Sequence, residues 1–266
     1  IVGDPTLAAP AAKSLLEARW VAALGNPEIF CMAPADQTWR PLLATDPSQT
    51  YDSLVLAWDM LGTQGALSEA SAQQLLNTSE SYAQQVGRRA MSLPTPAEVP
   101  NVVRHLTELQ ESLDIGFALY VHPRSDGFAE ADVWRACAAL GLDLSPNGLF
   151  ELRSPDWPTP LLGVGPVDTD QFTLSAAASG RSHSGLEVGF SVPLSSDPMK
   201  SLESCFLCAQ HLAQRLRGAV FDDEDQPVSD RSRAQMRSAL AQAVAALSRA
   251  GVPAGSVQAL KLFRSG

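Results

Sequence analysis

The apolar positions in the second half of the chain follow two different periods. Between 186 and 192, Leu186, Val188 and Phe190 alternate with polar or small residues, which is typical of a strand with one buried face. From 202 to 216 the apolar residues recur three and four positions apart, as on one face of an amphipathic helix: Leu202, Cys205, Phe206, Ala209, Leu212, Ala213 and Leu216. We therefore expect a strand followed by a long helix.

The remaining segments of the second half add further strands and helices. Apolar runs bounded by turn-forming residues predict strands over 115–121, 149–152, 161–164, 172–177 and 219–221. Apolar residues at helical spacing predict one helix from about 130 that ends before Gly141. Another helix is expected after Ser229, the predicted N-cap, and it ends before Gly251. The segment after about 251 is weakly patterned, and we expect a weakly ordered tail.

The first half shows the same order of elements. Helices are expected over 14–24, 72–86 and 102–113, and strands over 29–32 and 54–60. Ile1 and Val2 are interpreted as the remains of a first strand that is otherwise missing.

Short stretches of sequence recur between the halves in the same order. The run AALG at 22–25 recurs at 138–141, IF at 29–30 corresponds to LF at 149–150, and PLL at 41–43 recurs at 160–162. Further on, LVLAW at 54–58 corresponds to LEVGF at 186–190, and AQ at 83–84 recurs at 213–214. An ordered series of this kind indicates an internal duplication. With 266 residues, we expect a shortened domain over 1–113 and a full domain over 114–266.

Composition and charge limit the class of partner. The chain is 45% hydrophobic and 18% charged, values typical of a globular protein. Its net charge of -10 repels nucleic acid and anionic lipid, so nucleic acid is not expected as a partner. The chain contains no apolar run of the length of about 18 residues that spans a bilayer.

The chemically reactive residues do not form a recognisable catalytic or metal-binding motif. Cys205 and Cys208 have the spacing of half a zinc site, but no second ligand pair follows. Ser182, His183 and Asp170 could be combined into a triad, as residues of almost any chain this size could be. The acidic run 222–225 lacks the alternating ligands of a calcium loop. We expect no enzyme activity, cofactor or metal.

The order of motifs from 185 to 247 resembles the C-terminal domain of the ZipA family of bacterial division proteins. A strand ending in Val192-Pro193 precedes a helix that carries Gln210-His211. The run GAVFDD at 218–223 and a terminal helix follow. The run FTLSA at 172–176 stands where the family has a similar strand. The likeness covers about 114–250, and a weaker version covers the first half.

This resemblance implies a fold and a function. The fold would be α+β, with two tandem domains, each an antiparallel sheet with about three helices on one face. The uncovered face would bind the C-terminal tail of FtsZ, the tubulin-like division protein, or a related peptide. The domain would act without a cofactor in septation, on the cytoplasmic side of the bacterial inner membrane, held by an anchor upstream of this chain.

The resemblance also implies which residues form the peptide-binding groove. Matching strand by strand gives Ile115, Phe117, Leu119, Asn147, Leu149, Ser175, Ala177, Glu187 and Gly189. Glu187 and Gly189 stand where the family has Thr and a large aromatic residue, and losing an aromatic ring removes about 150–250 Å² of contact. Two alternatives therefore stay open. One is a scaffold that has lost FtsZ binding and contacts another protein, and the other is a hydrolase with a site between the halves.

Overall fold

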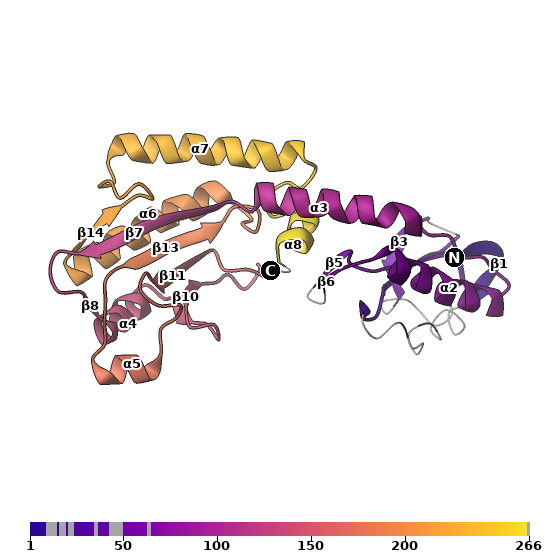
Figure 1. Ribbon diagram of the computed structural model, residues 1–266, viewed down its shortest axis with the longest axis horizontal. Coiled ribbons are helices and arrows are strands. Elements are labelled where there is room, and N and C mark those ends of the chain that lie inside the picture. Colours follow the sequence, from indigo (N-terminus) through magenta and orange to yellow (C-terminus); the bar gives the residue numbers. More distant parts are fainter. Residues whose placement is uncertain are drawn as a thin grey trace. The chain divides into compact units, whose positions relative to one another are not determined.

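The computed structural model describes residues 1–8, 15, 20, 24–34, 37–42, 50–62 and 65–264, with the backbone alone given for 2–8. It separates into two compact units, Ile1–Glu108 and Leu109–Arg264, here called the N-terminal and C-terminal units (Figure 1). The division falls within α3 (Val99–Leu113). Both units combine helices with antiparallel sheets, which confirms the α+β class.

A six-stranded antiparallel sheet organises the C-terminal unit. Its strand order is β14-β7-β13-β11-β10-β9. The bounds are β7 (Gly116–Pro123), β9 (Asp143–Leu144), β10 (Phe150–Leu152), β11 (Leu162–Pro166), β13 (Leu186–Ser191) and β14 (Gly218–Phe221). A separate short pair joins β8 (Phe128–Ala129) to β12 (Ser182–His183). The helices are α4 (Glu130–Ala139), α5 (Leu174–Ser179), α6 (Pro198–Leu216), α7 (Asp230–Arg249) and α8 (Val257–Phe263).

One face of this sheet is buried by helices. Figure 1 shows α6 running alongside β14, β7 and β13, with which it makes its main contacts. The apolar stripe predicted for this helix is buried there, as Leu202, Phe206 and Leu212 show. On α4, Trp134 packs edge-on against Phe150 of β10, with ring centroids 5.3 Å apart, and the Phe150 ring lies 5.4 Å from that of Phe172. The side that these helices cover is called the helix-covered face.

The ends of α6 are set by local sequence. Asp197 is the N-cap, and its side chain accepts a hydrogen bond from the Lys200 amide at 3.1 Å. Pro198 follows at the first helical turn, where its missing N–H costs nothing. Arg217 ends the helix in the left-handed conformation, with φ 58°, and Gly218 begins β14 directly afterwards.

Two predictions for the C-terminal unit are wrong. The segment 172–177 was expected to be a strand, but Leu174–Ser179 forms α5. Thr173 caps this helix by accepting from the Ala176 amide at 3.2 Å, and three consecutive alanines favour helix. The tail expected to be weakly ordered contains α8, where Ala259, Leu262 and Phe263 are buried.

A buried network of charged and polar groups lies beside α4 and α5. Glu130 accepts hydrogen bonds from the Thr173 amide at 2.8 Å and from the indole of Trp134 at 3.3 Å. Its other oxygen lies 3.1 Å from Nε2 of His183, whose Nδ1 lies 2.8 Å from Asp168. Burial raises the pKa of Asp168, but hydrogen bonds from His183 and the Ser184 amide outweigh it and lower that pKa. The network joins α4, the β12 strand and the turn before α5.

The N-terminal unit has a four-stranded antiparallel sheet in the order β1-β4-β2-β3. The bounds are β1 (Val2–Ala8), β2 (Glu28–Met32), β3 (Trp39–Pro41) and β4 (Thr50–Ala57). A small pair, β5 (Leu61–Gly62) and β6 (Gly65–Ala66), leads to α2 (Glu69–Gln85) and, after the 3₁₀ turn η4 (Pro96–Glu98), to α3. The expected loss of the first strand is therefore wrong, because β1 is present. The helix predicted over 14–24 lies mostly outside the described residues.

Aromatic rings and a buried arginine hold the core of this unit together. Trp20 packs edge-on against Trp58 with centroids 5.2 Å apart and lies 5.3 Å from Tyr82 of α2. Arg88 is buried and donates to the main-chain carbonyls of Asp52 at 2.5 Å and Tyr51 at 3.2 Å. Because these carbonyls belong to β4, Arg88 ties the segment after α2 to the sheet.

The two sheets agree in part with the repeat seen in the sequence. β4 lies next to β1 as β13 lies next to β7, and the glycines of the AALG runs, Gly25 and Gly141, both have positive φ. The strands that contain 29–30 and 149–150 do not occupy the same place in the two sheets. β2, which contains 29–30, pairs directly with β4, whereas β10, which begins at 150, is separated from β13 by β11. Among the described residues, no helix combines the length and apolar character needed to cross a bilayer.

The buried network generates a stability prediction. Glu130→Ala removes the acceptor shared by Thr173, Trp134 and His183, so we expect the free energy of unfolding to fall by about 2–4 kcal/mol. Asp132→Ala, in the same helical turn but exposed, should cost about 0.5 kcal/mol or less. Urea unfolding followed by circular dichroism measures both. Equal losses for the two variants would contradict the role given to Glu130.

Candidate functional site

The face of the C-terminal sheet opposite the helices is the candidate site, and strand pairing identifies its residues. Leu119 and Val121 of β7 lie opposite Val188 and Leu186 of β13, and all four are buried. The intervening positions point to the other side of the sheet. These are Gly116, Ala118, Tyr120, His122, Leu149, Glu151, Gly163, Gly165, Glu187, Gly189, Ser191, Ala219 and Phe221. We call this side the open face. Glu151 is 6% exposed, and all the other residues of the open face are partly or fully exposed.

The structure places three of the nine predicted groove residues on the open face: Leu149, Glu187 and Gly189. The helix-covered face instead receives the alternate positions Ile115, Phe117 and Leu119. On that face the Phe117 ring stacks on the Phe190 ring, with centroids 6.2 Å apart. The prediction is wrong for these three because it shifted the alternation of the first strand by one residue, which moves every side chain to the opposite face.

The other three predicted residues do not lie on a sheet strand. Asn147 is exposed in the turn between β9 and β10, where its side chain contacts the hydroxyl of Ser145. Ser175 and Ala177 belong to α5. The strand next to β13 is instead β11, which contributes Gly163 and Gly165 to the open face. The sequence predicts a strand at 161–164, but the groove residues were matched to other strands.

Three glycines lie together in the middle of the open face. Gly163 pairs directly with Gly189, and Gly165 pairs with Glu187. We call Gly163, Gly165 and Gly189 the glycine strip. A Cβ on Gly189 would lie only 2.7 Å from the main-chain oxygen of Phe117, so β7 and β13 approach too closely for a side chain there. At Gly163 the nearest atom would be 4.0 Å away. The strip exposes main chain that a ligand can approach.

Aromatic and acidic side chains lie on β7 and its two neighbours. Tyr120 lies between Glu187 of β13 and Phe221 of β14 in the strand register. The ring of His122 is 6.3 Å from that of Tyr120 and 5.0 Å from that of Phe221. Burial raises the pKa of Tyr120, and the carboxylates of Glu187 and Asp223 raise it further. This part of the face therefore combines ring surfaces with negative potential.

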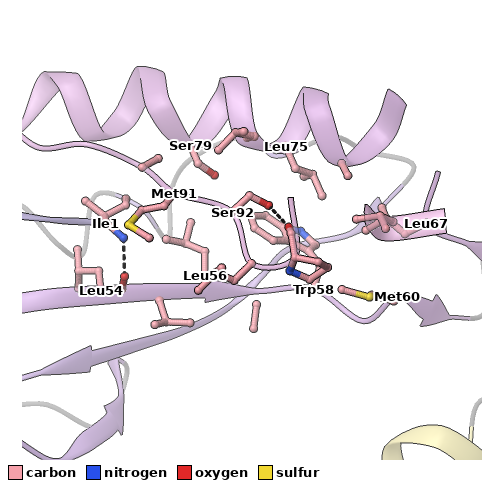
Figure 2. A pocket seen from close by; sticks show the side chains of 18 of the residues that line it. Ile1, Leu54, Leu56, Trp58, Met60, Leu67, Leu75, Ser79, Met91 and Ser92 are labelled. Atoms are coloured by element: carbon pink, nitrogen blue, oxygen red, sulfur yellow. Dashed lines mark hydrogen bonds between the residues drawn. The ribbon is translucent and has the colours of Figure 1, made fainter. Parts of the chain in front are cut away.

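The N-terminal unit has an apolar cleft of about 440 Å³ between β4 and α2. Figure 2 shows Leu54, Leu56 and Trp58 facing Leu75 and Ser79 of the helix, with Met91 beside them. The rim carries Met91 and Leu93, which are 64% and 85% exposed. The lining offers few polar atoms that could orient a ligand.

The next question is whether side chains of the described residues could bind a metal ion or act as reactive thiols. Among the described residues, no three His, Cys, Asp or Glu side chains converge on a position that could hold a metal ion. His183 illustrates why, since Glu130 and Asp168 bind opposite nitrogens of its ring. Cys205 and Cys208 are buried in the helix-covered core, and burial raises the pKa of Cys208 to about 12, which keeps its thiol protonated and unreactive.

The comparison with known families finds a match within the C-terminal unit. Residues 116–239 match the family model described as ZipA, C-terminal FtsZ-binding domain. The matched segment runs from the start of β7 into α7 and so contains every strand of the open face. It is just under half of the 266 residues. No curated protein matches the chain.

The glycine strip generates a second prediction. Gly189→Ala places a methyl group against the Phe117 carbonyl, so we expect a loss of about 1–3 kcal/mol in the free energy of unfolding. Its direct partner provides the control, because Gly163→Ala meets no close atom and should be neutral or stabilising by up to about 1 kcal/mol. Thermal unfolding of both variants checks the difference. A Gly189→Ala variant as stable as Gly163→Ala would show that the strands do not approach so closely.

Proposed function

We propose that this protein is a cell-division interaction module that binds the C-terminal tail of FtsZ, because residues 116–239 match the ZipA C-terminal family model. The tail, or a related peptide, lies on the open face of the C-terminal sheet. The proposal concerns binding alone and assigns no chemical step to the protein.

The open face is the observation that supports this proposal most directly. Tyr120 and Phe221 offer partly exposed rings, and aromatic side chains are the usual anchors of protein interfaces. The glycine strip beside them allows the main chain of a ligand to lie close to the sheet. α4 and α6 pack on the opposite face, where Phe150 contacts Trp134 of α4 and Phe206 of α6 is buried.

The buried network favours a binding role over catalysis. His183 and Glu130 are 1% and 0% exposed, so a substrate cannot reach either side chain without opening the fold. Glu130 is also fully engaged by hydrogen bonds within the unit. Glu130 and His183 thus have a structural role within the buried network.

A scaffold that contacts a different protein is the second candidate. Gly189 favours the scaffold, because a side chain at this position would collide with β7. The open face therefore lacks an aromatic anchor at its centre. A ligand of this face must gain its contact area at the flanks, from Tyr120, Phe221 and Leu149. Binding of an FtsZ tail separates the two candidates.

We propose the same evolutionary origin for both units, with domains over 1–113 and 114–266. The shared positions of β4 and β13, each next to the first strand of its sheet, support it, as do the matching positive φ values of Gly25 and Gly141. The different placement of β2 and β10 is the main departure. We also propose that the protein acts on the cytoplasmic side of the bacterial inner membrane, as FtsZ binding requires.

Binding to the open face leads to a third prediction. Ala118 lies at its centre, opposite Gly189, and Ala118→Lys should weaken binding of an FtsZ tail peptide at least about tenfold by placing a long charged side chain there. The matched control is Leu207→Lys, since Leu207 is 69% exposed on α6. Isothermal titration calorimetry with the peptide of the source organism measures both variants.

Two results would contradict the proposal. If the unmodified protein gives no heat with the peptide at each of two well-separated temperatures, it does not bind the FtsZ tail, because apolar binding that is thermally silent at one temperature gives heat at another. If Ala118→Lys binds as tightly as Leu207→Lys while both remain folded by circular dichroism, the tail binds elsewhere on the molecule.

A further inference from the structure

One corner of the open face differs in chemistry from the rest. Tyr120, His122 and Phe221 bring three rings together across β7 and β14, with His122 in contact with both of the others. All three side chains are partly exposed. A surface of adjacent exposed rings can pack against an apolar group or against a cation, which is attracted by the electron-rich faces of aromatic rings.

Carboxylates surround these rings. Glu187 is exposed and lies directly opposite Tyr120 in the register, and Asp223, exposed two residues after Phe221, helps to raise the pKa of Tyr120. Asp225 lies 3.5 Å from Nε2 of His122. No salt bridge found within the described residues involves Glu187 or Asp223. We call Tyr120, Phe221, Glu187 and Asp223, together with His122, the acidic corner.

The loop after β14 holds its carboxylates in place. The side chain of Asp222 accepts hydrogen bonds from the amides of Glu224 at 3.2 Å and Gln226 at 2.8 Å. The amide of Asp222 in turn donates to the Gln226 carbonyl at 2.9 Å. Asp222 is thus used within the loop, whereas Asp223 remains exposed beside the rings.

We propose that the acidic corner binds the side chain of an arginine or lysine of the docked peptide. The cation packs on the Tyr120 and Phe221 rings and is paired by Glu187 and Asp223. This rests on the proposed function, because it requires a peptide on the open face, and it adds the chemistry of the partner. The peptide crosses the glycine strip at Gly163 and Gly189, beside the Leu149 side chain that lies against Gly165, and reaches the corner with its basic residue.

Charge complementarity favours a basic side chain over an acidic or purely apolar one at the acidic corner. The chain carries a net charge of -10, so an acidic peptide or an anionic lipid surface is repelled by the whole molecule as well as by the corner. A purely apolar side chain would leave Glu187 and Asp223 beside it with poorer solvation. A guanidinium or ammonium group can pack on the aromatic rings and form ion pairs with the carboxylates at the same time.

The first experiment uses model peptides and does not involve FtsZ. Acetyl-Leu-Arg-Leu-amide is titrated into the intact chain, with the citrulline analogue, which is isosteric and uncharged, as the matched ligand. Amide shifts in ¹⁵N-HSQC spectra give the affinities. We expect the arginine peptide to bind about three- to tenfold more tightly and to shift the amides of Tyr120, His122 and Phe221.

Charge-neutral variants locate the effect. Glu187→Gln combined with Asp223→Asn should abolish the preference for arginine over citrulline. The control removes two exposed carboxylates of α3, with Glu108→Gln and Glu111→Gln, and should keep the preference. The proposal is overturned if arginine and citrulline peptides bind alike, or if the control pair removes the preference as completely as the corner pair does.

An FtsZ tail peptide then separates this proposal from the proposed function. If the tail binds and arginine is not preferred over citrulline, the acidic corner is wrong while FtsZ binding stands. If the tail does not bind but the corner pair abolishes a clear arginine preference, the corner is right and its natural partner is another basic peptide.

Discussion

The burial of one side of β7 and β13 against α6 determines the rest of the C-terminal unit. Leu119 and Val121 pair with Val188 and Leu186, and all four are buried on the side that α6 covers. Since side chains alternate along a strand, this contact also fixes which residues form the open face. Tyr120 and Glu187 are exposed because their neighbours in sequence are core residues. The interaction site is in this sense a consequence of the packing on the other side.

The close approach of β7 and β13 adds a second constraint. Gly189 lies where a Cβ would meet the Phe117 carbonyl at 2.7 Å, whereas its partner Gly163 has room. The same strand pair thus supplies a tightly packed core side and an open side whose centre carries only the methyl group of Ala118 beside Gly189. Contacts with a ligand shift to the flanks, where Tyr120 and Phe221 lie beside carboxylates. An aromatic anchor in the middle of this face would require the two strands to move apart.

The sequence predicts the order of elements well and the site less well, for a physical reason. At 186–191 the apolar positions alternate with Glu187, Gly189 and Ser191, so the buried side is unambiguous and the structure confirms it. At 115–121 nearly every residue is apolar on both sides of the strand, so the pattern cannot distinguish the two faces. The wrong choice placed Ile115, Phe117 and Leu119 on the open face. The run at 172–177 has apolar residues compatible with a strand, but its alanines and the Thr173 cap favour the helix that forms.

The helix that faces β4 in the N-terminal unit buries mostly small side chains, and this explains the cleft between that helix and the strand. The buried side chains of α6 include Leu202, Phe206 and Leu212, and this helix packs against β7, β13 and β14. Those of α2 are Ala72, Leu75, Ser79 and Ala83, and the smaller volume leaves about 440 Å³ beside β4. Protein interiors are normally packed as densely as organic crystals, so small residues facing a sheet leave space that neighbouring chain must close. Met91 and Leu93 lie at that opening but stay largely exposed, which leaves the cleft accessible from solvent.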